Sequence, residues 1–360
     1  MERRSVCIIN RGQSFFDPNT TTLYFIEERE NIMRKILSAV LCTVLAASVL
    51  VGCGGTKAET TTTTTEATSS ASKETTEETT GATATEMTIE HSKGTTVVPM
   101  NPQKVVVFDL GILDIMDSLG VDVDVAVPTD NLTSYLEKYA SATNAGGIKQ
   151  PDIEGIYEFQ PDVIFISGRQ SDYYDELNEI APTVYVDQEA TAYMEDFEKN
   201  VNMIAELFGK QEEATKQLDE IKQLIAEGQE KAEASDEKAL IVLTNDGSIS
   251  AYGKGSRFGI VHDVLGVKVA DDSIEVSTHG QEASFEYISK VNPDILFVID
   301  RTAVVGGETG ASDTLDNELV KETNAGKNNK IVYLDAETWY LGGAGLTSIR
   351  KMVEEVVNAL

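Results

Sequence analysis

The sequence is poor in cysteine and histidine, two residue types on which much catalytic and metal chemistry depends. Its three cysteines are Cys7, Cys42 and Cys53, so the chain beyond residue 53 has no thiol. Disulfides, a cysteine nucleophile and cysteine-ligated metals are therefore excluded from that part of the chain. The three histidines, at positions 91, 262 and 279, are too dispersed to predict the clustered ligands of a zinc or manganese site.

The short motifs that mark common enzyme classes are missing as well. The sequence contains no Gly-x-Ser-x-Gly elbow, no HExxH helix and no phosphate-binding P-loop. We therefore expect a binding protein without catalytic residues rather than an enzyme.

Positive charge is scarce. There are 29 Lys and Arg against 60 Asp and Glu, a formal net charge of -31. Nucleic-acid affinity comes largely from clustered basic residues, so we expect no nucleic-acid partner. Docking on anionic lipid through a polybasic face is excluded on the same ground. With 41% hydrophobic residues the chain still has the composition of a globular protein.

The N-terminal part reads as a leader. Arg34 and Lys35 precede the uncharged apolar run Ile36–Val51, which has the order of a secretory signal. The run is shorter than the roughly 20 residues of a membrane span. Residues 1–52 are therefore predicted to be a leader, and because residues 1–32 lie upstream of a complete signal, we expect a start codon assigned too early.

The leader ends Leu50-Val51-Gly52-Cys53-Gly54, which resembles a bacterial lipobox. The resemblance implies that Cys53 becomes the lipidated N-terminus, with the protein anchored on the extracellular face of the cell membrane. The alternative is an ordinary signal peptide with an incidental cysteine. Residues 53–87 are rich in Thr, Ser, Ala and Glu and predict a disordered tether.

After the tether, apolar runs alternate with helical periodicity, which is typical of α/β folds with parallel sheets. We expect an N-terminal lobe over 88–190, a helical connector over 191–236 and a C-terminal lobe over 237–360. Each lobe is predicted to be Rossmann-like, the connector to be a long rigid α-helix with a possible break at Gly209, and the ligand cleft to lie between the lobes. Predicted strands are 104–109, 123–127, 163–167, 183–186, 240–244, 295–300 and 331–334, with helices at 112–119, 171–180 and 345–360.

The two lobes repeat each other. Glu154, Pro161-Asp162 and Arg169 recur 132 residues later as Glu286, Pro293-Asp294 and Arg301. Each arginine follows a predicted buried strand, so each is expected at the carboxyl edge of its sheet, where open α/β sheets bind ligands. Two such lobes facing each other would bring both arginines to one ligand. The alternative is that each arginine pairs with a surface carboxylate.

Four stretches in order carry a family resemblance: Ile166–Gln170, Gly255–Gly259, Thr278–Arg301 and Leu334–Leu341. From about Lys93 to its end the chain resembles the siderophore-binding lipoproteins of ABC importers, in the catecholate branch of the helix-linked, class III binding proteins. The resemblance implies that Arg169, Arg257 and Arg301 face an anionic ferric siderophore. It also implies an ABC permease as partner, a monomer, and no intrinsic cofactor.

Some proteins of that family complete the iron coordination with a His and a Tyr, and His279 and Tyr340 occupy the matching motifs. Phenolate oxygen suits ferric iron, and a neutral imidazole can complete its coordination sphere. The alternative is that Tyr340 only stacks on the ligand and His279 is a loop residue. Trp339, the single tryptophan, is expected to pack inward.

The repeated Glu154 and Glu286 match the surface carboxylates through which such proteins dock on their permease. Both also lie near the start of a predicted helix, where the helix dipole alone favours a carboxylate. One departure from the family is the stretch Ser171–Tyr174, where some relatives have a basic residue. It leaves the charge of the preferred siderophore open. Haem or cobalamin as cargo, or a non-transport surface adhesin, remain alternatives.

Overall fold

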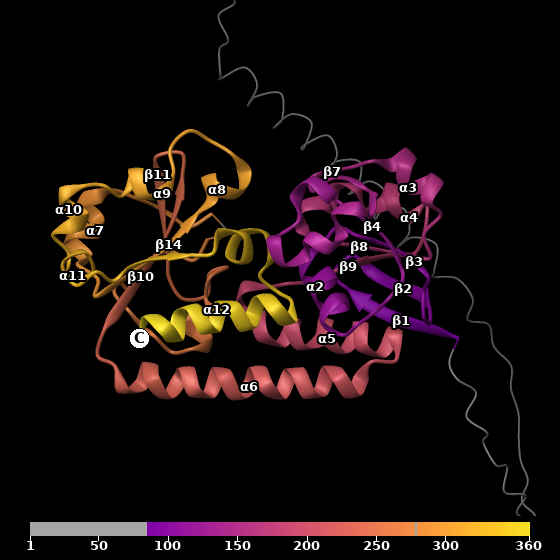
Figure 1. The fold of residues 1–360 in the computed structure, drawn as a ribbon, viewed down its shortest axis with the longest axis horizontal. Coiled ribbons are helices and arrows are strands. Elements are labelled where there is room, and N and C mark those ends of the chain that lie inside the picture. The colour runs from indigo at the N-terminus through magenta and orange to yellow at the C-terminus, as the bar shows by residue number, and fades with distance from the viewer. Residues whose placement is uncertain (1–84, 278) are drawn as a thin grey trace, which may run out of the picture. The chain divides into compact units, whose positions relative to one another are not determined.

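The computed structural model describes residues 85–277 and 279–360, which belong to one compact unit. The predicted leader, Cys53 and almost all of the predicted tether lie outside these residues. Two α/β lobes are connected by helices (Figure 1). Within the described ranges, no helix combines the length and the apolar composition that a membrane span needs.

The N-terminal lobe is built on a five-stranded sheet in the order β5-β4-β3-β8-β9. All four strand pairs are parallel, as predicted. The first strand of this sheet, β3, is also its central strand, and the chain adds β4 and β5 on one side before β8 and β9 on the other. Such sheets bind ligands at the carboxyl ends of the strands where the order reverses, which here are β3 and β8. The elements are β3 (Lys104–Val107), α2 (Leu110–Ser118), β4 (Asp124–Val127), β5 (Thr143–Asn144), β6 (Gly146–Gly147), β7 (Gln150–Pro151), α3 (Ile153–Phe159), β8 (Val163–Ile166), α4 (Tyr174–Asn178) and β9 (Thr183–Tyr185).

An antiparallel hairpin precedes this sheet and was not predicted. It consists of β1 (Glu86–His91) and β2 (Gly94–Pro99), joined by a tight turn. The hairpin begins within the last residues assigned to the tether, whose Thr-rich composition continues into β2.

The connector consists of two helices, α5 (Tyr193–Phe208) and α6 (Gln211–Ala234). Gly209 separates them in a left-handed conformation (φ 67°) and donates its N–H to the carbonyls of Ala205 and Glu206. This is a common helix end, and glycine adopts it without the steric cost of a Cβ. The helical connector is therefore interrupted at Gly209, as the sequence predicted.

The C-terminal lobe contains a six-stranded mixed sheet, in which β10 pairs in parallel with β12 and β14 but antiparallel with β11. The antiparallel part departs from the predicted parallel sheet. Its cause is the turn Asp246-Gly247, where both residues have positive φ, as two-residue hairpin turns of type I′ require. The elements are β10 (Lys238–Asn245), β11 (Ser248–Tyr252), β12 (Lys268–Val269), β13 (Gln281–Ala283), α7 (Phe285–Val291), β14 (Ile295–Asp300), α8 (Arg301–Val305), α9 (Ala311–Thr314), α10 (Glu318–Lys321), α11 (Asn324–Lys327), β15 (Ile331–Leu334) and α12 (Leu346–Ala359).

The C-terminal helix α12 ties the two lobes together. It packs against α6 and, at its N-terminal end, against α2 of the other lobe. There the fully buried Asp114 of α2 accepts hydrogen bonds from the backbone N–H groups of Thr347 (3.1 Å) and Ser348 (2.8 Å). These bonds satisfy N–H groups that the first turn of a helix leaves free. One continuous hydrophobic core runs from the N-terminal lobe through α5, α6 and α12 into the C-terminal lobe.

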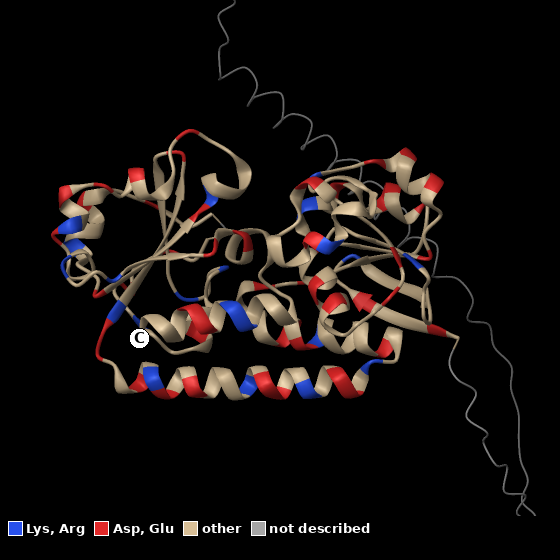
Figure 2. Cartoon of the chain, viewed as in Figure 1, with Lys and Arg blue, Asp and Glu red and all other residues tan. Residues whose placement is uncertain are grey.

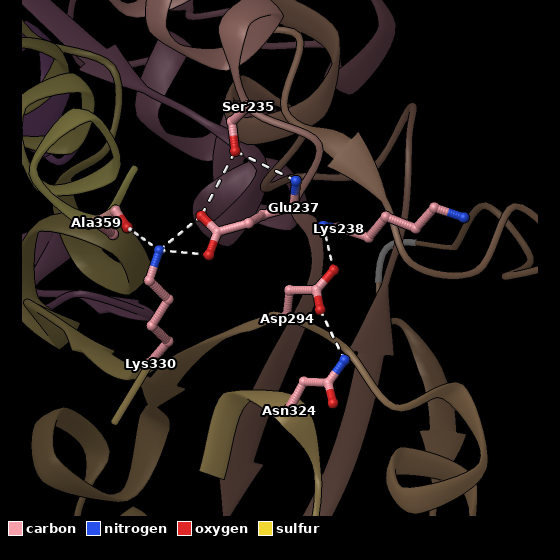
Figure 3. A network of polar contacts seen from close by, with 7 residues as sticks. All are labelled: Ser235, Glu237, Lys238, Asp294, Asn324, Lys330 and Ala359. Carbon is pink, nitrogen blue, oxygen red and sulfur yellow. Dashed lines mark hydrogen bonds and ion pairs between the residues drawn. The ribbon is translucent and has the colours of Figure 1, made fainter. Parts of the chain in front are cut away.

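The predicted repeat is confirmed in the fold. Asp162 accepts hydrogen bonds from the N–H groups of Gln103 (2.7 Å) and Lys104 (3.0 Å), at the start of β3. Asp294 accepts the equivalent bond from Lys238 (3.0 Å), at the start of β10 (Figure 3). In each lobe the Pro-Asp pair therefore fastens the beginning of the central strand.

Figure 3 also shows how the connector joins the C-terminal lobe. Lys330 donates to both carboxylate oxygens of Glu237 (2.6 Å each) and to the carbonyl of Ala359 (3.4 Å). Glu237 lies between α6 and β10, so a single ammonium links the end of the connector, the start of β15 and the end of α12.

Candidate functional site

A cavity of about 610 Å³ is lined by residues of both lobes. Asp109, Arg169 and Tyr185 come from the carboxyl ends of N-terminal strands. Arg257 comes from a loop of the C-terminal lobe, and Tyr340 from its short π-helix Glu337–Gly342. The cavity therefore lies where the sequence predicted the ligand cleft.

Arg169 lies in a 3-10 turn directly after β8. Ser167 begins this turn and donates its N–H to the side chain of Gln170 (3.1 Å), which fixes the loop. The guanidinium of Arg169 donates to the backbone carbonyl of Tyr340 at 2.8 Å. Burial, together with the nearby charge of Arg257, lowers the pKa of Arg169, but a guanidinium remains protonated in proteins.

Arg257 approaches the same acceptor from the C-terminal lobe. Its Nη2 donates to the carbonyl of Tyr340 at 3.2 Å. Its guanidinium carbon lies 5.0 Å from the ring centroid of Phe258 and 4.8 Å from that of Tyr340, within the range of cation–π attraction. The buried Phe258 is itself fixed by an edge contact with Tyr252.

Arg301 is the first residue of α8, at the carboxyl end of β14. Its Nε donates to the hydroxyl of Tyr340 at 2.7 Å, and its Nη1 donates to the side chain of Asn245. Asn245 ends β10, the strand next to β14. The sequence analysis missed Asn245, although its place at the carboxyl end of a predicted central strand could have identified it.

All three arginines predicted from the sequence thus meet at one residue, Tyr340. Burial would raise the pKa of its phenol, but the hydrogen bond from Arg301 and the charges of the three arginines outweigh this effect and lower the pKa. The site therefore favours negative charge on oxygen at this position.

The neighbouring Trp339 packs inward, as predicted, and is 3% exposed. Its indole N–H donates to Glu355 at 2.6 Å. Burial raises the pKa of Glu355. Trp339 also contributes to the cavity wall, so the single tryptophan can report on ligand binding.

His279 is not brought to the arginines. It is exposed, and its backbone N–H donates to the hydroxyl of Ser277 at 3.2 Å. The cavity wall includes Ser277 but not His279. Among the described residues, no group of three or more His, Cys, Asp or Glu side chains is placed to hold a metal ion.

Glu154 and Glu286 are both exposed, each at the second position of its helix, α3 and α7. Figure 2 shows that the positions of Asp and Glu are distributed over both lobes and along α6. The arginines of the cavity are therefore a local exception in a strongly acidic molecule.

Comparison with known proteins places the chain in a family. A model of the periplasmic binding proteins matches residues 105–338. The petrobactin-binding protein YclQ of Bacillus subtilis is 44% identical over 280 residues, covering 76% of this chain and 88% of the relative. The ferric-anguibactin-binding protein FatB of Vibrio anguillarum is 37% identical over 282 residues, covering 76% and 87%.

Solved structures agree with the sequence matches. The crystal structure of YclQ has a TM-score of 0.74 at 43% identity and covers 76% of this chain and 98% of its own. The periplasmic catecholate-siderophore binding protein VctP of Vibrio cholerae has a TM-score of 0.70 at 35% identity, covering 75% and 99%. These matches confirm the predicted fold class and the expectation of a non-enzymatic binding protein. The chain belongs to the periplasmic binding protein family.

Proposed function

We propose that this protein captures a ferric siderophore of the catecholate class outside the cell and delivers it to an ABC permease. The observation that carries the proposal is the convergence of Arg169, Arg257 and Arg301 on the carbonyl and hydroxyl of Tyr340, beside a cavity shared by both lobes. Three permanent cations aimed at oxygen atoms suit a ligand whose oxygens carry net negative charge.

The energetics of such a site are favourable. Hydrogen bonds to charged groups contribute about 1.5–3 kcal/mol each, so three arginines supply much of what tight binding needs. The planar guanidinium also matches paired oxygens better than an ammonium does. The names of the relatives YclQ, FatB and VctP, which bind petrobactin, ferric anguibactin and catecholate siderophores, support the same ligand class.

Tyr340 is proposed to bind the iron directly when a siderophore leaves coordination positions open. Its lowered pKa favours the phenolate, the form that ferric iron prefers. The corresponding role of His279 requires the segment after Ser277 to turn its imidazole toward the cavity. A ligand that fills all six positions would use Tyr340 for stacking and hydrogen bonding only.

Delivery is proposed to follow the family pattern. Cys53 would carry the lipid that holds the monomeric protein at the extracellular face of the membrane. Glu154 and Glu286, one on each lobe, would dock on basic residues of the permease. Ligand capture would involve modest motion, because the shared core and the contacts of Asp114 with α12 resist wide opening of the lobes.

Titration of the purified protein tests the ligand class. The ferric complex of a tris-catecholamide, the ferric complex of a trihydroxamate, haem and cobalamin are added while the fluorescence of Trp339 is followed. We expect saturable quenching by the ferric catecholate at submicromolar concentration. Quenching by haem or cobalamin alone, or by none of the four, would overturn the proposal.

Titration with the ferric complex of a tetradentate bis-catecholate tests whether Tyr340 binds the iron. The charge-transfer band of the bound complex should differ between the wild-type protein and Tyr340→Phe, because the variant cannot supply phenolate oxygen. An identical band in the two proteins means that Tyr340 does not bind the iron.

A further inference from the structure

The hairpin β1–β2 lies outside the part of the chain that matches the family model, which begins at residue 105. Its tip nevertheless reaches the segment that lines the cavity after β9. Ser92 at the tip donates its N–H to the carboxylate of Asp187 at 3.0 Å, and Asp187 belongs to the cavity wall.

Further contacts hold the hairpin in this position. The hydroxyl of Thr96 donates to the carbonyl of Thr183, in β9, at 2.8 Å. Lys199 of α5 donates to the carbonyl of Glu90 at 3.4 Å. The ring of His91 contacts Tyr174 edge-on, with the centroids 5.8 Å apart. The tip is therefore fastened to the sheet and the connector rather than projecting freely into solvent.

The hairpin carries a cation to the ring of Tyr185, a residue of the cavity wall, while Lys93 itself is exposed and is not a wall residue. The ammonium of Lys93 lies 5.7 Å from the ring centroid of Tyr185, in the range of cation–π attraction. Tyr185 lines the cavity. Its hydroxyl lies 3.7 Å from the position that a Cβ atom at Gly168 would occupy. Gly168 precedes Arg169, so the hydroxyl of Tyr185 lies beside the loop that carries the arginine of the N-terminal lobe.

The charged residues near Tyr185 determine how much Lys93 contributes to binding of an anionic ligand. Two carboxylates, Asp187 and Glu189, line the same side of the cavity. His91 lies close enough to both Asp187 and Lys199 for their charges to act on it. Lys93 therefore adds a positive charge beside Tyr185, where Asp187 and Glu189 would otherwise repel an anionic ligand.

We propose that Lys93 and Tyr185 form a subsite for one aromatic ring of the ligand. The ring packs on Tyr185, and the ammonium of Lys93 attracts its anionic oxygens and offsets Asp187 and Glu189. This inference rests on the proposed function, and it adds a specificity element contributed by a hairpin that precedes the residues matched by the family model. The subsite favours anionic aromatic siderophores over neutral ones.

The test compares Lys93→Ala, Lys93→Glu and Lys93→Arg by Trp339 quenching, using the anionic ferric tris-catecholamide and the neutral ferric trihydroxamate. Lys327→Ala is the control, because Lys327 is an exposed lysine of α11 paired with Glu322. At low salt we expect catecholate binding about threefold weaker in Lys93→Ala and about tenfold weaker in Lys93→Glu. Lys93→Arg should stay within about twofold of the wild type.

The differences should shrink as salt is added, since mobile ions screen exposed charges. Tyr185→Leu should weaken catecholate binding at all salt concentrations, because it removes the ring but no charge. Wild-type affinity in Lys93→Ala and Lys93→Glu, or an equal loss for the neutral complex, would overturn the subsite alone. Absence of catecholate binding by the wild-type protein would overturn both the subsite and the proposed function.

Discussion

The segments 154–169 and 286–301 have the same structure up to the ends of their strands and differ in how they place the arginine. Each has an exposed glutamate at the second position of a short helix, a left-handed residue after the helix, and an aspartate that fastens the central strand. After β8, Arg169 enters a 3-10 turn and donates to the carbonyl of Tyr340. After β14, Arg301 begins α8 and donates to the hydroxyl.

This difference shows what a duplicated unit determines and what it leaves to its surroundings. The repeat brings each arginine to the carboxyl edge of its sheet. The atom that each guanidinium meets depends on the next loop and, for Arg301, on Asn245 from the neighbouring strand. The two lobes therefore offer the same charge to one ligand from two different directions.

The glutamates of the two copies give the largest expected effect. Glu154→Ala combined with Glu286→Ala should abolish uptake of the ferric siderophore by cells while leaving its affinity for the purified protein unchanged, because both side chains are exposed away from the cavity wall. Radioactive iron uptake and fluorescence titration measure the two quantities. Normal uptake by the double variant would contradict the docking role, and Glu220→Ala on α6 is the exposed control.

Substitution of Arg169 or Arg301 has the second largest expected effect. Arg169→Ala and Arg301→Ala should each weaken ferric catecholate binding by about tenfold to a hundredfold, because each loses a charge-assisted hydrogen bond. Arg350→Ala is a matched control, since Arg350 pairs with Glu220 at 3.1 Å on the surface. Titration of the three variants measures the losses. If both cavity variants bind like the control, the arginines do not contact the ligand.

The aspartates test whether the copies are equivalent in stability. Asp162→Ala and Asp294→Ala should each lower the free energy of unfolding by about 1–2 kcal/mol. The first leaves two backbone N–H groups at the start of β3 without their acceptor, and the second leaves the N–H of Lys238 at the start of β10 without its acceptor. Urea unfolding provides the measurement, with exposed Asp219→Ala on α6 as control. A loss in only one variant would show that the two copies contribute unequally.

Much of this architecture could be predicted because it depends on local patterns. Val163–Ile166 and Ile295–Asp300 are short apolar runs after a Pro-Asp pair, and both are buried parallel strands. The constant spacing of Glu, Asp and Arg between the two copies predicted the repeat. The repeat and the sheet edges identified Arg169 and Arg301, whereas Arg257 came from motif resemblance alone, and the structure brings all three together.

The rest depends on contacts that a linear pattern does not contain. The acceptor shared by Arg169 and Arg257 is a backbone carbonyl, which every residue possesses and no motif identifies. The hairpin β1–β2 follows a Thr-rich segment whose composition conceals its strands. Lys93 therefore gave no sequence signal, because its role depends on Tyr185, a residue 92 positions further along the chain.

The smallest expected effect concerns the residues that end the two short helices. Gln160 and Asn292 have φ values of 53° and 50°, the left-handed region in which a Cβ is unfavourable. Asn tolerates this conformation better than Gln, because its short polar side chain bonds locally. Gln160→Gly should therefore raise the free energy of unfolding by up to about 1 kcal/mol. Asn292→Gly should give no such gain, because it also removes the hydrogen bond that the side-chain oxygen of Asn292 accepts from the N–H of Asn324 at 2.8 Å. Urea unfolding of both variants measures the contrast, and equal gains at the two positions would show that the type of side chain does not matter there.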